Sequence, residues 1–275
     1  MMPCLIRLLT SHGVQPAPYS ADSLVEAARH EPHDGVYTVA NTFETFKVLN
    51  LTAHLDRLED SARREQIALA LDRARLRAAL RQMISESGYG DVRFRITVGR
   101  EQPEVLILSI EPFGAYPASL FSEGVCCQTL PNSARHNPSA KSTGWMHDRE
   151  QIALQPGMYT GLLLDERGQI LEGINSNFYA ILDGCLRTAG EGVLPGIAQQ
   201  IVFEVAPPII PLERQAVHVS DLPQLSEAFI TSSSRGIMPV VEIDGIQIGA
   251  GKPGTITQAL RAAYQAWVAA HLESL

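Results

Sequence analysis

From residue 120 onward, short apolar runs alternate with dipeptides that favour tight turns. The turn signals are Arg167-Gly168, Asp183-Gly184 and Asp244-Gly245, in which glycine and aspartate tolerate the left-handed backbone of a hairpin turn. The intervening runs have the composition of strands. We expect strands over residues 159–164, 169–171, 177–182 and 228–231. This pattern predicts a β-rich carboxyl-terminal region.

The region before residue 114 carries both helical and strand periodicities. Leu55, Leu58 and Ala62 fall on one face of a helix that opens near residue 52, and residues 76–84 repeat this spacing. Apolar residues at 92, 94, 96 and 98 then alternate with polar ones, which is typical of a strand with one apolar and one polar face. A second such run over 105–110 can pair with the first as a hairpin.

Prolines and glycines divide the chain after this hairpin. Pro112, Gly114 and Pro117 break both periodicities. We therefore expect a mixed α+β fold with an amino-terminal α+β domain over 1–113, a linker over 114–119 and a larger β-rich domain over 120–275. Two helices interrupt the strands of the second domain, one after residues 194–196 and one over 255–273.

Composition excludes several classes of protein. Of the 275 residues, 45% are hydrophobic and 19% charged, which is enough for a large core. The net charge of -8 disfavours nucleic acid and anionic lipid as partners. The amino-terminal apolar run is interrupted by Pro3 and Arg7 and is too short for a signal peptide, so we expect a cytoplasmic protein without a membrane partner.

Cysteine and histidine spacing predicts no metal site. The four cysteines form no C-x-x-C pair, and the eight histidines form no H-x-x-x-H pair. The adjacent Cys126 and Cys127 favour a strand core over a redox centre. Unpaired thiols in a chain of this length suit a reducing compartment.

Five segments in a fixed order carry a family resemblance. They are His54-Leu-Asp-Arg57-Leu, Asn137-Pro-Ser-Ala-Lys141, Leu171-Glu172-Gly-Ile-Asn175-Ser-Asn177-Phe178, Leu194-Pro-Gly196-Ile197, and residues 229–240 with the run Thr231-Ser-Ser-Ser234. Glu172 lies 31 residues after Lys141. From about Gly35 to Tyr264, this set resembles the class IV aminotransferases, which are fold-type IV enzymes that use pyridoxal phosphate.

The resemblance implies roles for two of these residues. Lys141 would hold the cofactor as a Schiff base and then act as general base and acid. The chain has two other lysines, Lys47 and Lys252, and neither falls on a family motif. Glu172 would keep the pyridine nitrogen protonated, which makes the ring an electron sink. A surface charge at Lys141 and an exposed turn residue at Glu172 are the alternatives for each residue taken alone.

Other residues would bind the cofactor phosphate and ring. The resemblance implies that the backbone amides of Ile197 and Ala198 receive the phosphate at the start of a helix, together with Arg57 and Ser233. Ala198 stands where the family often has threonine, which removes one hydroxyl contact but leaves the amides. Arg135 lies where it would reach the cofactor phenolate.

Substrate recognition is less well determined by the sequence. Arg93 resembles a carboxylate-binding residue of related transaminases, although a solvated strand face explains it equally well. Tyr37 resembles an aromatic pocket wall, and Ser234 belongs to the same serine run as Ser233. Asn41 and Met146 depart from the branched-chain enzymes, so the specificity of those enzymes does not carry over.

These observations favour an aminotransferase that moves an amino group from an amino acid or amine to a 2-oxo acid in two half-reactions. An aminodeoxychorismate-type lyase that releases pyruvate is the alternative enzyme. A catalytically silent protein on the same scaffold is the alternative from another class, and a hydrolase built on Ser233 lacks a recognisable histidine or aspartate partner. The resemblance also implies a homodimer.

Overall fold

The structure, a computed structural model, describes residues 4–275, so Pro3 lies outside it. The chain forms two compact units. Unit 1 contains residues 4–115, 140–152 and 271–275, and unit 2 contains residues 116–139 and 153–270. The chain first passes from unit 1 to unit 2 between residues 115 and 116, within the predicted linker over 114–119. Residues 140–152 and 271–275 belong to unit 1, whereas the sequence predicted one continuous second domain over 120–275.

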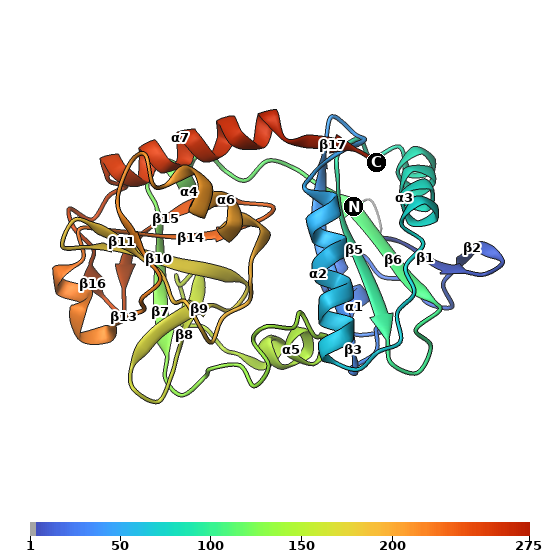
Figure 1. The fold of residues 1–275 in the computed structure, drawn as a ribbon, viewed down its shortest axis with the longest axis horizontal. Helices are drawn as coiled ribbons and strands as arrows, with labels where there is room; N and C mark the ends of the chain where they lie inside the picture. The colour runs from blue at the N-terminus through green and yellow to red at the C-terminus, as the bar shows by residue number, and fades with distance from the viewer. Residues whose placement is uncertain (1–3) are drawn as a thin grey trace. The chain divides into compact units, whose positions relative to one another are not determined.

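A seven-stranded antiparallel sheet forms the centre of unit 1 (Figure 1). In sheet order its strands are β17 (Leu272–Ser274), β4 (Lys47–Leu49), β3 (Gly35–Phe43), β5 (Val92–Gly99), β6 (Leu106–Pro112), β1 (Leu5–Thr10) and β2 (Gly13–Pro16). Antiparallel pairing of β5 with β6 confirms the predicted hairpin.

Helices cover both faces of this sheet. Helices α2 (Leu51–Arg64) and α3 (Arg73–Ser87) pack on one face, where their apolar residues join Phe94 of β5 in one core cluster. Full burial of each large apolar side chain contributes about 1.5–3 kcal/mol. The short helix α1 (Leu24–Ala28) packs on the opposite face against Ile6.

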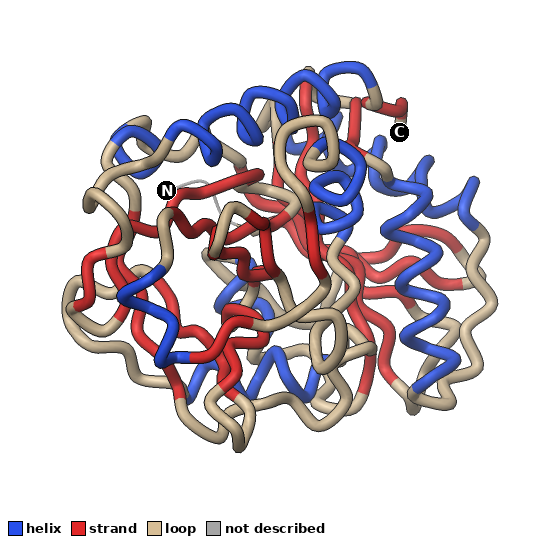
Figure 2. The backbone as a smooth tube through the Cα atoms, turned by 60° about the vertical axis from the view of Figure 1, so that its left-hand side comes forward, coloured by secondary structure: helices blue, strands red, loops and turns tan. Residues whose placement is uncertain are grey.

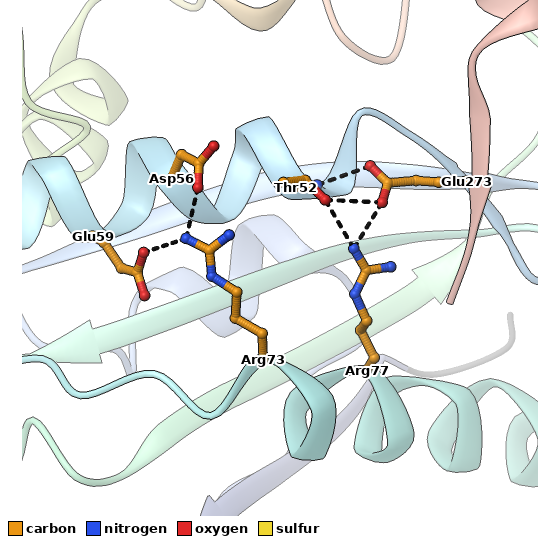
Figure 3. A network of polar contacts seen from close by, with 6 residues as sticks. All are labelled: Thr52, Asp56, Glu59, Arg73, Arg77 and Glu273. Carbon is orange, nitrogen blue, oxygen red and sulfur yellow. Dashed lines mark hydrogen bonds and ion pairs between the residues drawn. The ribbon is translucent and has the colours of Figure 1, made fainter.

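Helix α2 obtains its amino-terminal cap from the far end of the chain. Its cap residue Asn50 makes no side-chain cap bond. Instead, Glu273 accepts hydrogen bonds from the Thr52 amide at 2.9 Å and the Thr52 hydroxyl at 3.0 Å, and it pairs with Arg77 of α3 at 2.7 Å (Figure 3). Arg73 also bridges the two helices through Asp56 and Glu59. The carboxyl terminus therefore helps to fix α2.

Unit 2 is built on a closed β-barrel. Strands β10, β14, β15, β7, β8 and β9 pair in that order, and β9 pairs with β10 to close the ring. The bounds of these strands are β7 Val125–Leu130, β8 Thr160–Leu164, β9 Gln169–Gly173, β10 Ser176–Leu182, β14 Glu227–Ser232 and β15 Gly236–Ile243. Apolar residues such as Phe178, Ile230 and Met238 form one buried cluster of the barrel unit. Closure leaves these six strands without an open edge.

The remaining elements of unit 2 extend the barrel or cover it. Short strands β11 (Cys185–Arg187), β12 (Leu212–Glu213), β13 (Val217–His218) and β16 (Ile246–Gln247) extend the sheet. The α-helices of unit 2 are α4 (Ser119–Ser122), α6 (Ile197–Val205) and α7 (Thr255–Ala270), which are labelled in Figure 1. Figure 2 draws all helices of the chain in blue. Within residues 4–275, no helix has the length and apolar character needed to cross a membrane.

Local predictions are confirmed at the turns and corrected at the carboxyl terminus. Asp183-Gly184 and Asp244-Gly245 have positive φ at both residues, as two-residue hairpin turns require. The predicted helix over 255–273 instead ends at Ala270, because Leu272 pairs with Leu49 in the sheet of unit 1.

The adjacent cysteines lie in a strand, as expected. Both belong to β7, and Cys127 is fully buried. Burial raises the pKa of the Cys127 thiol to about 12. A thiol with so high a pKa is almost wholly protonated near neutral pH, so Cys127 is suited to packing in the core.

Candidate active site

Lys141 is held by its backbone in unit 1. Its amide donates to the Ser61 hydroxyl of α2 at 3.1 Å, and its carbonyl accepts from the Tyr37 amide of β3 at 3.0 Å. Ser142 then caps the helix α5 (Thr143–Asp148) by accepting from the Trp145 amide. A helix and a strand thus position Lys141 on both sides of its peptide.

The side chain of Lys141 lies over an aromatic ring. Its Nζ is 4.6 Å from the centre of the Tyr37 ring, within the range of a cation–π contact. Tyr37 is buried and packs with Met146 and Ala28. Tyr37, the predicted pocket wall, therefore lies against the lysine amine.

A buried polar chain connects β3 with α2 beside this lysine. The Arg57 guanidinium donates to the Thr38 hydroxyl at 3.5 Å, and that hydroxyl is 3.0 Å from Nδ1 of His54. Burial lowers the pKa of His54 well below its usual range, and the positive charges of Arg57 and Lys141 lower it further. His54 is therefore neutral at pH 7, which avoids a third positive charge in this cluster.

The two arginines of β5 are both paired with glutamates. Arg93 pairs with Glu111 of β6, whose other oxygen accepts from the Leu24 amide at 2.7 Å. Arg95 is buried and pairs with the buried Glu31. The polar face of β5 is thus largely internal, because the segment that follows α1 covers part of it, and it is not the solvated face of the alternative interpretation. The carboxylate-binding role of Arg93 stays a prediction.

Glu172 is buried near the end of β9 in unit 2. Its Oε1 lies 3.3 Å from Nη1 of Arg135, and its Oε2 accepts from the Leu194 amide at 3.1 Å. The same Arg135 nitrogen donates to the Pro138 carbonyl at 3.3 Å. The structure brings Arg135 onto the carboxylate, whereas the sequence pointed to the cofactor phenolate.

The segment that carries Leu194 leads into a helix whose N-cap residue is a glycine. Asn177 of β10 donates to the Leu194 carbonyl at 2.9 Å. A Cβ at Gly196 would lie 2.0 Å from Oδ1 of Asn177, so glycine is required for this approach. Helix α6 begins at Ile197, and its N-cap residue, Gly196, has no side chain with which to bind the first amides. The first amides of α6, including those of Ile197 and Ala198, can therefore receive an anion.

Ser233 and Ser234 lie in the turn between β14 and β15. Ser232 pairs with Gly236 across this turn, and the Ser234 hydroxyl is 3.4 Å from the Tyr116 hydroxyl. The β9–β10 turn lies at the same end of the barrel, because Asn177 pairs with Glu172 on one side and with Thr231 on the other. Glu172 and the turn with Ser233 are thus carried by the ends of β9 and β14, the two strands that flank β10.

Comparison with known proteins places this chain in a family. The family model described as amino-transferase class IV matches residues 35–243. The branched-chain-amino-acid aminotransferase of Escherichia coli K12 is 27% identical over 270 residues, covering 88% of this chain and 87% of that protein. The D-alanine aminotransferase of Listeria monocytogenes is 26% identical over 284 residues, covering 92% of each.

Solved structures agree on the fold. A branched-chain aminotransferase from Thermoproteus uzoniensis superposes with a TM-score of 0.81 at 21% identity, covering 99% of both chains. The chain belongs to the class IV aminotransferase family, whose members work with pyridoxal phosphate. The predictions of family, fold class, aminotransferase activity and cofactor are thereby confirmed.

Some residues beside the site were not found from the sequence. Thr38 orients Arg57, and Arg235 contacts both Ser232 and Asn175. Arg235 lies within the motif segment over residues 229–240, but an arginine next to a run of serines only weakly predicts such contacts. Across residues 4–275, no group of three or more histidine, cysteine, aspartate or glutamate side chains could hold a metal ion.

Proposed function

We propose that the protein exchanges an amino group between an amino acid and a 2-oxo acid, with Lys141 as the residue that carries the reaction. One observation supports this choice among the three lysines. Lys141 is fixed by its backbone and lies over Tyr37, whereas Lys47 forms a surface ion pair with Glu44 and Lys252 is exposed.

The residues present fit pyridoxal phosphate in charge and chemistry. The cofactor needs an amine, a carboxylate and an anion site, and the chain offers Lys141, the buried Glu172 and the amino terminus of α6, whose N-cap residue is Gly196. When bound, the cofactor supplies a ring that accepts the electron pair released at the substrate Cα. The chain therefore has to supply the binding groups and the proton transfers.

Each residue then has a defined task. Nζ of Lys141 would hold the aldehyde carbon, and after substrate binding it would move the proton between Cα and the cofactor C4′. Glu172 would hold the proton on the pyridine nitrogen. The amides of Ile197 and Ala198 would bind the phosphate, and Arg57 would add a cation held in place by Thr38.

Three further residues complete the proposal. The Ser233 hydroxyl would give another contact to the phosphate, and Ser234 would lie beside the substrate. Arg135 would hold Glu172 until the pyridine nitrogen takes that carboxylate, and its reach to the phenolate stays a prediction.

Relatives define the range of substrates to be tested. Solved relatives contain norvaline and 4-methylvaleric acid, and other relatives are named for D-alanine and for branched-chain amino acids. We propose an amino acid with an apolar side chain as donor, because Tyr37 and Met146 give an apolar wall beside Lys141. A homodimer and a cytoplasmic location are further parts of this proposal.

The test is a donor screen with the cofactor-loaded enzyme. L- and D-alanine, L-leucine, L-glutamate and a primary amine are offered with pyruvate or 2-oxoglutarate, and product is measured by chromatography. We expect Lys141→Ala to lower turnover by about 1000-fold or more and to remove the visible absorbance of the lysine-bound cofactor, whereas Lys47→Ala changes neither. Unchanged absorbance in Lys141→Ala would refute the assignment. Pyruvate release from aminodeoxychorismate without an oxo-acid acceptor would favour the lyase.

A further inference from the structure

Arg235 occupies the last position of the turn between β14 and β15. The turn contains residues 233–235, its Arg235 amide donates to the Ser232 carbonyl at 3.3 Å, and Gly236 follows with φ of 65°. This is a three-residue hairpin in which a left-handed glycine leads into the next strand. The turn that carries Ser233 is therefore short and has a defined backbone.

The Arg235 side chain joins this turn to two other segments of unit 2. Nε donates to the Ser232 hydroxyl at 2.8 Å, and Nη2 donates to Oδ1 and the carbonyl of Asn175 at 2.7 and 3.2 Å. Nη1 donates to the Tyr159 hydroxyl at 3.3 Å, and the guanidinium lies 5.6 Å from the centre of that ring. One planar group thus satisfies acceptors from three parts of the chain.

These contacts connect the two turns that carry proposed cofactor residues. Asn175 lies in the β9–β10 turn, three residues after Glu172, and Ser232 directly precedes Ser233. β10 lies between β9 and β14, so sheet hydrogen bonds align the strands but do not join the two turns directly. The Arg235 fork makes that direct connection outside the sheet.

We propose that Arg235 is a positioning residue that sets the distance between the Ser233 turn and Glu172. This inference rests on the proposed function, in which Ser233 contacts the phosphate and Glu172 the pyridine nitrogen of one rigid molecule. A turn held in advance binds such a molecule without a further loss of conformational entropy. Lysine has the charge of arginine but not its planar fork, so it cannot satisfy the three acceptors together.

The test compares two ligands that differ only in the phosphate. Affinity for pyridoxal phosphate and for pyridoxal is measured by fluorescence titration for the wild type, Arg235→Met and Arg235→Lys. We expect both variants to bind pyridoxal phosphate about tenfold more weakly, with pyridoxal affinity nearly unchanged. Arg187→Met is the matched control, because Arg187 pairs with Glu213 on β11 and β12 of the same unit, and it should change neither affinity.

A milder variant guards against misfolding. Asn175→Ala removes an acceptor on an exposed turn, and in combination with Arg235→Met it should add little further loss, because both changes break the same connection. Wild-type affinity in Arg235→Lys, or equal weakening for both ligands in Arg235→Met, would overturn the proposal. If Ser233→Ala leaves phosphate-dependent binding unchanged, the proposed function fails at that residue. If Ser233→Ala weakens the binding of pyridoxal phosphate but the Arg235 variants do not, this inference alone fails.

Discussion

Each unit buries one arginine against one glutamate, and the two pairs differ in geometry. In unit 1, Nε and Nη2 of Arg95 reach Oε1 of Glu31 at 2.9 and 2.6 Å, and the Thr97 hydroxyl donates to Oε2 at 2.5 Å. In unit 2, Nη1 of Arg135 reaches Glu172 at 3.3 Å. Exposure does not separate them, because all four side chains are at most 5% exposed.

This difference fits a structural role for Glu31 and the ligand-binding role proposed for Glu172. Short contacts from two nitrogens of one guanidinium hold Glu31 in one orientation. The contact at Glu172 is longer, so less interaction energy is lost when that carboxylate turns toward another cation. The Leu194 amide also ties Glu172 to the segment that opens α6, so the carboxylate and the proposed phosphate site are coupled through one loop.

The largest expected effect is at the tight pair. Glu31→Gln leaves the Arg95 guanidinium buried without its counter-charge, which should lower the free energy of unfolding by about 3–5 kcal/mol. Urea denaturation measures this loss, and the exposed Glu101→Gln serves as the control. A loss below about 1 kcal/mol would mean that Arg95 reaches water in the folded protein. It would contradict the structural role assigned to the Arg95–Glu31 pair.

The second effect is on catalysis at the longer pair. Glu172→Gln should lower kcat by about 100-fold, equivalent to ~2.7 kcal/mol of barrier, because an amide cannot hold the pyridine nitrogen protonated. Its free energy of unfolding should fall less than that of Glu31→Gln. Steady-state kinetics and urea denaturation of the same preparations check both statements. Normal kcat with a large stability loss would reverse the two assignments.

A third experiment concerns a buried polar group without a counter-charge. The pKa of His54 is lowered in the folded protein, so between its usual value of 6.5 and the folded value the unfolded chain binds the extra proton. The free energy of unfolding is therefore not reduced by His54 above pH 6.5. Below pH 6.5 it falls by up to about 1.4 kcal/mol per pH unit. His54→Gln should remove this part of the pH dependence in thermal unfolding at pH 7.5, 6.5 and 5.5. An unchanged slope would show that folding does not lower the pKa of His54.

The smallest effect belongs to a more exposed pair. Burial raises the pKa of Glu273, but the hydrogen bonds from Thr52 and Arg77 outweigh it, so the pKa lies below its ordinary value of 4.5. Glu273→Gln should cost about 0.5 kcal/mol at pH 7, and the difference from the wild type should disappear as the pH falls through the folded pKa. Urea denaturation at pH 7 and at pH 3 measures it, because the folded pKa lies below 4.5. A constant difference across this range would assign the effect to packing.

Local patterns predicted those features that depend on neighbouring residues. The alternation over 92–98 gave β5, and the aspartate–glycine dipeptides gave the hairpin turns. The motif spacing also singled out Lys141 and Glu172, which the structure holds on ordered backbone. These features need no information from distant parts of the chain.

Long-range contacts explain what the sequence did not reveal. The helix expected over 255–273 is cut short by pairing with β4, whose residues lie more than 200 positions earlier. The burial of Arg95 depends on Glu31, which is 64 residues away. Arg235 was missed for the same reason, since its acceptors in Asn175 and Tyr159 are 60 and 76 residues away. Side-chain periodicity cannot predict such partners, because it depends only on neighbouring residues.

The cap that Glu273 places on α2 also has a consequence for synthesis. Thr52 and Glu273 are separated by 221 residues. At about 5–20 residues per second, a ribosome needs roughly 10–45 s to make the intervening chain. The helix that carries His54 and Arg57 is therefore made early but receives its cap only after Glu273 leaves the exit tunnel. The six barrel strands, which run from Val125 to Ile243, are all made within this interval, so the barrel is complete before the cap forms.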